Sequence, residues 1–312
     1  MDAKLKKGIL FGLIGNLFVG FQPIIVKLSP SSLDAFIFAA STCLIEAILF
    51  FPIMLIEMRV NRLKGEKSDF KNKISFLKTW KNHFWLFIII GVIFGLNQAL
   101  FIFGYRLTGP IIGSLLQKTT VFFGLIFGFT ILKEKVTKRQ ILFSIILFIG
   151  LAIAIILGQN SQGSFEINLI LGVFILLFIT CLWMYGHTIT KPVFNKNEVT
   201  PIQMVFVRNI LSGIMLIVAY ILFFPIGNFS LLAIPINQFF CIIFGVVYAI
   251  GLFCWYKTLY YLDVSKATII FSPTPIVSAI FSTLILRSDY TVFHLIGTIL
   301  VIVSIYVIVR QK

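Results

Sequence analysis

Long apolar runs, spaced along almost the whole chain, constrain the fold more than any other feature of this sequence. A helix rises about 1.5 Å per residue, so about 20 apolar residues cross a hydrocarbon core about 30 Å thick. The runs predict ten membrane-spanning helices, at roughly residues 8–27, 34–57, 84–105, 110–132, 138–157, 168–190, 201–224, 236–261, 265–286 and 291–309. The expected fold class is an all-α integral membrane protein, with the lipid bilayer as a partner.

The composition agrees with this reading and excludes a soluble domain. Hydrophobic residues make up 59% of the 312 residues and charged residues 12%, against about 45–50% and about 25% in soluble domains. The longest polar stretch, residues 58–83, is long enough for a loop with a short interfacial helix. Lys4, Lys6 and Lys7 precede the first apolar run, but no small-residue cleavage site follows, so we expect a retained first helix and not a signal peptide.

The net charge of +15 is a topology signal, because the basic residues gather on one side of the predicted spans. They lie at the N-terminus, in the 58–83 loop, after the fourth and sixth spans and at the C-terminus, whereas only Lys27, Arg106 and Arg287 fall on the other side. Cytoplasmic loops carry such an excess of Lys and Arg. We therefore expect a multi-pass protein of the cell (plasma or inner) membrane with both termini in the cytoplasm, and no nucleic-acid partner.

An internal echo divides the chain into two halves. Residues 132–137 (LKEKVT) follow the fourth span, and residues 286–291 (LRSDYT) follow the ninth, 154 positions later. This spacing predicts two repeats, residues 1–160 and 161–312, of five spans each. An odd number of spans inserts the second repeat upside down relative to the first. Inverted repeats can exchange conformations around a site near the bilayer midplane, which is typical of transporters.

These features also resemble a known family. Two five-helix halves, an L-x-E-x-x-T type motif at Leu132, Glu134 and Thr137, and a proline in the middle of the ninth span (Pro273 or Pro275) are similar to the drug/metabolite transporter (DMT) superfamily, of the EamA type. The resemblance covers essentially the whole chain. It implies ten helices, with spans four and nine near the centre and spans five and ten at the periphery. It also implies a cavity lined mainly by spans 1, 3, 4, 6, 8 and 9.

The sequence departs from the family pattern at a few places. The acidic residue expected after span nine is Ser288, with Asp289 beside it, and span four has Thr119 and Thr120 where span nine has its proline. The arginine that the family often has early in span seven is present as Arg208. Its counterpart in span two falls near Ser41.

Ionisable residues inside the predicted spans are the first candidates for function. Such a group costs roughly 2.5–3.5 kcal/mol by insertion scales, so it usually faces a partner or water. Lys118, with Gln117 beside it, is interpreted as the counter-charge for an anionic substrate group such as a carboxylate. The structural alternative is a buried Lys118–Glu46 or Arg208–Glu46 pair. If Glu46 instead faces a water path, it becomes a candidate for proton coupling.

Polar and aromatic residues in four further spans complete the predicted substrate site. Adjacent amides in one span cannot both face lipid comfortably, so at least one of them points inward. The stripe in span six is also typical of a packing seam, and the aromatic residues of span eight are also typical of an interfacial belt. The candidates are Asn16 and Gln22 in span one, Asn97 and Gln98 in span three, Trp183 and His187 in span six, and Trp255 and Tyr256 in span eight.

Motifs of enzymes and ATP-driven pumps are absent from the sequence. It contains no Walker A, HExxH or GxSxG motif, and its four cysteines fall inside predicted spans without metal-ligand spacing. We therefore expect no enzyme, no cofactor and no metal. The predicted function is secondary active transport, by alternating access, of a small polar or amphipathic metabolite, amino-acid-like or another organic anion or zwitterion. The alternatives are a broad-specificity efflux pump for amphipathic compounds and a non-transporting membrane scaffold or sensor; monomer and homodimer both stay open.

Overall fold

The computed structural model describes residues 3–65, 80–131, 133, 135–158, 167–196, 198–262, 267 and 270–310. Every regular element in these ranges is a helix. Seven of the helices are long and apolar enough to cross a membrane, and two shorter helices are also apolar. The prediction of an all-α membrane protein is thus confirmed. Part of the 58–83 loop, and Leu132 and Glu134 of the repeated motif, lie outside the described residues.

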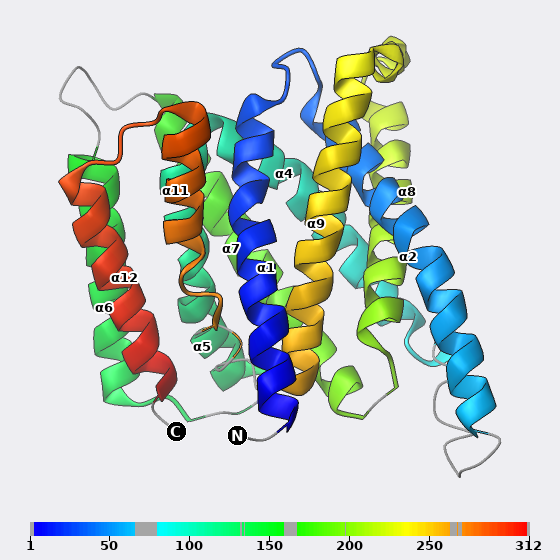
Figure 1. Ribbon diagram of the computed structural model, residues 1–312, viewed down its shortest axis with the longest axis horizontal. Coiled ribbons are helices and arrows are strands. Elements are labelled where there is room, and N and C mark those ends of the chain that lie inside the picture. Colours follow the sequence, from blue (N-terminus) through cyan, green and yellow to red (C-terminus); the bar gives the residue numbers. More distant parts are fainter. Residues whose placement is uncertain are drawn as a thin grey trace.

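The helices follow the predicted spans in order along the chain (Figure 1). A 3-10 turn joins α4 to α5, a π-helical turn extends α6, and a short 3-10 helix links α8 to α9. The elements are α1 (Ala3–Leu28), α2 (Ala35–Gly65), α4 (Phe84–Leu116), the 3-10 turn Gln117–Thr119, α5 (Thr120–Thr130), α6 (Lys138–Ala152) with the π turn Ile153–Leu157, α7 (Ile167–Asn195), α8 (Pro201–Phe223), the 3-10 helix Ile226–Ala233, α9 (Pro235–Tyr261), α11 (Thr274–Leu286) and α12 (Val292–Arg310).

The third and fourth predicted spans form a hairpin with almost no loop. The apolar stretch Phe84–Thr130 has 47 residues, which as a straight helix would measure about 70 Å. At Gly109 the backbone leaves the helix, with φ 75° and ψ 169°. A Cβ atom on Gly113 would lie 2.5 Å from Cε1 of Tyr105, whereas eight residues of straight helix would separate the two backbones by about 12 Å. The chain therefore folds back at Gly109, and Pro110 begins the second arm.

The ninth predicted span, residues 265–286, is interrupted by a turn within its described residues. The chain passes through a turn at Phe271–Pro273 before α11 begins at Thr274. The 13 residues of α11 extend about 20 Å, which is shorter than the hydrocarbon core. The predicted count of ten spans therefore stays a prediction, since it requires the two arms at Gly109 and the short α11 to be counted as separate spans.

The packing of the helices is nearly unchanged when the two halves are exchanged. The main helix pairs are α1 with α9, α4 with α7, α2 with α8 and α6 with α12. If each helix of the first half corresponds to the helix five spans later, the first two pairs exchange, and the last two pairs map onto themselves. In Figure 1 the α2–α8 pair and the α6–α12 pair lie at opposite edges, and both termini lie on the same side of the molecule.

Two separate hydrophobic clusters follow from this arrangement. The larger one contains residues of α1, α2, α4, α7, α8 and α9. The smaller one is formed mainly by α6 and α12, with Leu115 and Val121 from the hairpin. A Cβ atom on Gly297 would lie 2.5 Å from the carbonyl oxygen of Gly150, so small residues allow α6 and α12 to approach closely. The peripheral pair is thus packed apart from the main bundle.

Candidate functional site

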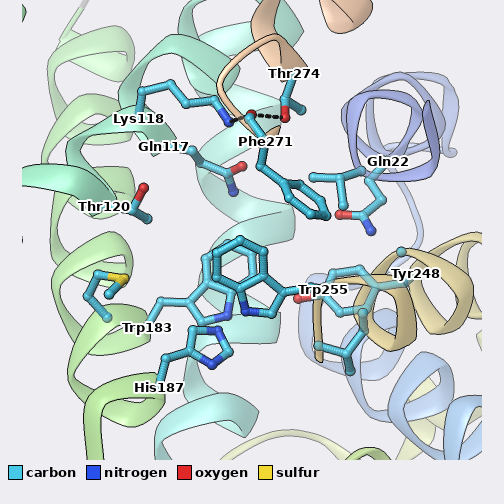
Figure 2. Close-up of a pocket in the computed structure, with 14 residues that line it drawn as sticks. Gln22, Gln117, Lys118, Thr120, Trp183, His187, Tyr248, Trp255, Phe271 and Thr274 are labelled. Atoms are coloured by element: carbon cyan, nitrogen blue, oxygen red, sulfur yellow. Dashed lines mark hydrogen bonds between the residues drawn. The ribbon is translucent and has the colours of Figure 1, made fainter. Parts of the chain in front are cut away.

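A cavity of about 80 Å³ lies between helices of both halves (Figure 2). One buried water needs about 10–15 Å³ of such volume, so the space corresponds to about five to eight water-sized positions. This is close to the number of heavy atoms in a small metabolite. The lining residues are Val19 and Gln22 of α1; Gln117, Lys118 and Thr120 of the second hairpin arm; Trp183, Met184 and His187 of α7; Tyr248, Gly251, Leu252 and Trp255 of α9; and Phe271 and Thr274 around the break before α11.

Lys118 joins the two halves at the edge of this cavity. Its Nζ atom donates a hydrogen bond of 2.6 Å to the main-chain carbonyl of Phe271, and the side chain is only 8% exposed. This carbonyl can accept the bond because the chain turns between Phe271 and Thr274 instead of continuing as a helix. Thr274 Oγ1 donates a second hydrogen bond to it, also of 2.6 Å. An ammonium group of the first half thus binds the broken span of the second half.

Asn16 supports the same break from α1. Its amide nitrogen donates to the carbonyl of Ile270. Its amide oxygen lies 2.6 Å from Thr274 Oγ1, whose single hydroxyl hydrogen is shared between this oxygen and the carbonyl of Phe271. Asn16 is 4% exposed and does not line the cavity. The sequence-predicted residue therefore lies one contact behind the cavity wall, where it positions Thr274.

Aromatic rings form the opposite end of the cavity from Lys118 (Figure 2). The imidazole of His187 lies 6.2 Å from the ring of Trp183, 5.6 Å from Trp255 and 5.5 Å from Tyr256, measured between centroids. Trp255 in turn contacts Phe271 edge-to-face at 4.9 Å. Trp183 and His187 are one helical turn apart on α7, so both reach the same face. The cavity therefore has a charged end and an aromatic end.

Glu46 and Arg208 lie behind the cavity, without a direct ion-pair contact between them in the described structure. Glu46 is fully buried, and its Oε2 accepts a 2.7 Å hydrogen bond from Asn209 Nδ2. Arg208 is 1% exposed, and its guanidinium carbon lies 3.8 Å from the ring centroid of Phe94. Among the described residues, neither Lys118 nor Arg208 approaches Glu46 within ion-pair distance. A structural Lys118–Glu46 or Arg208–Glu46 pair therefore stays a prediction, with no direct ion-pair contact among the described residues.

Arg208 nevertheless reaches the cavity wall through one contact. Its Nη2 lies 3.5 Å from the hydroxyl of Tyr248, which lines the cavity. Nε and Nη1 of this guanidinium have no hydrogen-bond partner in the described part of the protein. The positively charged guanidinium of Arg208 thus lies behind the cavity wall, next to the phenol group of Tyr248.

Some of the predicted substrate-binding residues line the cavity and others do not. Asn97 and Gln98 are both buried, as expected for adjacent amides, but they face the interior of the bundle; Gln98 Nε2 lies 3.5 Å from Thr42 Oγ1. Tyr256 is fully buried behind His187. The predicted residues that line the cavity are Gln22, Gln117, Lys118, Trp183, His187 and Trp255, and those that do not are Asn16, Asn97, Gln98 and Tyr256.

Eight of the 14 lining residues were not predicted from the sequence, among them Tyr248, Phe271 and Thr274. The two prolines of span nine, Pro273 and Pro275, were the signal for the last two, because a proline within a span frees main-chain carbonyls that need other partners. Tyr248 lies between apolar residues of its span and carried no such signal. The family resemblance implied a cavity lined mainly by spans 1, 3, 4, 6, 8 and 9. Among the described residues, each of these spans except span 3 contributes a lining residue.

Comparisons with known proteins agree with this architecture. A family model described as the EamA-like transporter family matches residues 6–156 and 170–310, one match in each half. A Bacillus subtilis (strain 168) protein named "Uncharacterized transporter YyaM" is 28% identical over 225 residues, which cover 70% of this chain and 71% of that protein. A solved structure described as "Crystal structure of protein" superposes with a TM-score of 0.68 over 97% of this chain and 96% of that one, at 13% identity. That last likeness concerns the fold alone.

Proposed function

This chain belongs to the EamA-like transporter family, within the DMT superfamily, and from that premise we propose that it is a secondary active transporter working by alternating access. The family and the relative's name point to a multi-pass membrane transporter and not to an enzyme. The proposed substrate is a small polar or amphipathic metabolite, either amino-acid-like or another organic anion or zwitterion. It would bind in the cavity between the two repeats, without a cofactor.

The observation that carries this proposal is the hydrogen bond from Lys118 to the carbonyl of Phe271. A carboxylate forms a stronger hydrogen bond with an ammonium group than a neutral carbonyl does. An anionic substrate can therefore take over the Lys118 ammonium and release the broken span of the second repeat, whose carbonyl keeps its bond from Thr274. Substrate binding would then favour one arrangement of the repeats over another, which is what coupling to a conformational change requires.

Two cationic contacts at the ends of the bundle support an alternating mechanism. Arg106, near the end of the first hairpin arm, donates a 2.8 Å hydrogen bond to the carbonyl of Leu33 in the segment that follows α1. Lys191, near the end of α7, donates to the carbonyls of Leu259 and Leu262 at the end of α9, at 3.0 and 3.4 Å. The two contacts join corresponding elements of the two repeats, at opposite ends of the molecule. They are suited to open one end at a time.

Purified protein provides the test. A thermal-shift screen would cover amino acids, organic acids, nucleotides, phosphorylated metabolites and amines, and each hit would be assayed for uptake into proteoliposomes. The Lys118→Met variant keeps the length of the side chain but removes its charge. Charge-assisted hydrogen bonds are worth about 1.5–3 kcal/mol, so we expect the Kd of the substrate to rise about 10- to 100-fold.

Lys257→Met is the matched control. The Lys257 ammonium lies 5.4 Å from the centroid of the Phe253 ring and is not part of the cavity wall, so this variant should bind and transport as the wild type does. A substrate that binds Lys118→Met with unchanged affinity would contradict the role of Lys118. If no stabilising compound entered proteoliposomes, the scaffold or sensor alternative would be favoured.

The aromatic lining supports a second candidate, the broad efflux pump. Trp183, Tyr248, Trp255 and Phe271 present large apolar surfaces to the cavity, and such surfaces bind amphipathic compounds without specific polar contacts. This candidate predicts that many unrelated amphipathic compounds stabilise the protein and that Lys118→Met changes none of their affinities.

A further inference from the structure

The residues that line the cavity carry hydrogen-bond donors that have no partner among the described residues. The indole Nε1 atoms of Trp183 and Trp255, the amide Nε2 of Gln117 and the Nδ1 of His187 are all buried and unpartnered in the described structure. An indole nitrogen or an amide nitrogen can only donate. The role of His187 Nδ1 depends on the tautomer. A buried donor without an acceptor costs about 1–3 kcal/mol, so these groups favour a ligand that brings acceptors.

These donors lie at two ends of the cavity. Gln117 is beside Lys118 and Phe271 at one end (Figure 2). Trp183 and Trp255 both contact the ring of His187, so the two indole N–H groups belong to the other end. A ligand that satisfies both sets needs an acceptor at each end of an elongated body.

The cavity offers no counter-charge for an ammonium group. None of its lining residues is an aspartate or a glutamate. Glu46, behind the wall, is already hydrogen-bonded to Asn209. Lys118 lies in the wall, and the guanidinium of Arg208 is 3.5 Å from the Tyr248 hydroxyl. A buried charge is stabilised by a nearby opposite charge and destabilised by a like one, so this environment favours anions and disfavours cations.

The rings of the wall also restrict the shape of the ligand. Trp183 and His187 are nearly parallel, with an interplanar angle of 28°, and Trp255 meets Phe271 at 86°. Flat faces and edges of this kind pack best against another flat ring. A volume of about 80 Å³ also limits the ligand to roughly one ring with small substituents.

We infer that the substrate is a small, flat, ring-containing carboxylate that lacks an ammonium group and carries a second hydrogen-bond acceptor opposite its carboxylate. Lys118 and Gln117 bind the carboxylate, and the indole N–H groups of Trp183 and Trp255 donate to the second acceptor. The inference rests on the proposed transport function and narrows its substrate class, since it excludes amino-acid-like zwitterions.

Three probes that differ at one ring position test this assignment by isothermal titration or thermal shift. Pyridine-4-carboxylate carries an acceptor nitrogen opposite its carboxylate, benzoate carries a C–H there, and 4-(aminomethyl)benzoate carries an ammonium group. The single lone pair of the pyridine nitrogen accepts one indole N–H, so we expect pyridine-4-carboxylate to bind about three- to tenfold more tightly than benzoate. The aminomethyl compound should bind more weakly than benzoate.

Variants separate the two ends of the site. Trp183→Phe and Trp255→Phe keep an aromatic ring and remove the N–H. At least one of them should reduce the affinity for pyridine-4-carboxylate towards that for benzoate, and both should leave benzoate binding almost unchanged. Trp85→Phe is the matched control, because Trp85 is 74% exposed on the surface of the bundle. Lys118→Met should weaken the binding of both acids.

Several results would overturn the inference. They are equal or tighter binding of the aminomethyl compound, equal affinities of the two acids, no effect of either Trp→Phe change, or no binding of any probe. The transport proposal is judged separately, by uptake of a screened compound into proteoliposomes. Uptake of an amino acid that depends on Lys118 would leave that proposal standing and remove this inference.

Discussion

Glu46 and Asn209 show how a buried polar residue in a span can be structural. One carboxyl oxygen of Glu46 accepts the amide hydrogen bond of Asn209 at 2.7 Å, and the other has no partner among the described residues. The two residues lie on α2 and α8, which pack against each other in the helix pair that maps onto itself when the halves are exchanged. Their hydrogen bond therefore links the two halves at a place away from the cavity wall.

We predict that Asn209→Ala lowers the free energy of unfolding by about 2–3 kcal/mol, because a buried carboxyl group would lose its only protein donor. The measurement is denaturant unfolding in detergent, followed by tryptophan fluorescence. A double-mutant cycle with Glu46→Ala isolates the bond, because alanine removes the acceptor. If Asn209→Ala were equally destabilising in the Glu46→Ala background, the two side chains would not be coupled.

At the residue scale, the sequence showed which residues of the spans are polar, but it did not show reliably which of them line the cavity. Lys118, Gln22 and Gln117 line the cavity, and they could be found because polar groups in an apolar span need a partner or water. Asn97 is equally polar and also buried, but it does not line the cavity. Phe271 contributes a main-chain carbonyl, which its own side chain could not predict and only the nearby prolines indicated.

The hairpin at Gly109 is the element that depends most on a single residue. Its φ of 75° and ψ of 169° fall in a region that is essentially restricted to glycine. A Cβ atom added there would have no atom within 4 Å. Any cost of a substitution is therefore conformational and not steric.

We predict that Gly109→Ala destabilises the protein by about 1–3 kcal/mol, the usual cost of a residue held in such a region. Gly227→Ala is the matched control, since a Cβ atom there also meets nothing within 4 Å and the φ of Gly227 is not positive. Thermal unfolding of both variants in the same detergent is the measurement. Equal melting temperatures for the two variants would contradict the prediction, because they would show that a side chain at Gly109 does not strain the backbone.

The ends of some helices could not be predicted from the hydropathy pattern. The predicted spans 84–105 and 110–132 left a short loop, whereas the helix continues to Thr108 and the turn is confined to Gly109. Apolar residues continue through the turn, so hydropathy could not locate it. The prolines of span nine did indicate a break, but the pattern did not show that α11 begins at Thr274, after a turn at Phe271–Pro273.

On the scale of the whole molecule, the two halves interlock. Each of the helix pairs α1–α9, α4–α7, α2–α8 and α6–α12 joins one helix from each half. Neither repeat therefore has a complete core of its own. The sequence could predict the inversion from an odd number of spans and the charge bias, but it could not predict which helices pair, because lipid-facing and protein-facing residues are equally apolar in spans.

We predict that both termini face the cytoplasm. They lie on the same side of the molecule (Figure 1), and the basic residues predominate on that side of the predicted topology. Epitope tags at either end should be cut by protease in inverted membrane vesicles and protected in intact spheroplasts. A tag inserted at Gly227, in the segment between α8 and α9 at the opposite end, should show the reverse pattern. The same pattern for all three tags would contradict this topology.

The turn at Gly109 also has a consequence for how the protein is made. The 47 residues from Phe84 to Thr130 contain two arms, and one glycine separates them. No polar loop exists to hold the first arm across the bilayer while the ribosome synthesises the second. We therefore expect the two arms to insert as one helical hairpin, with both of its ends held in the cytoplasm by the basic segments that precede and follow it.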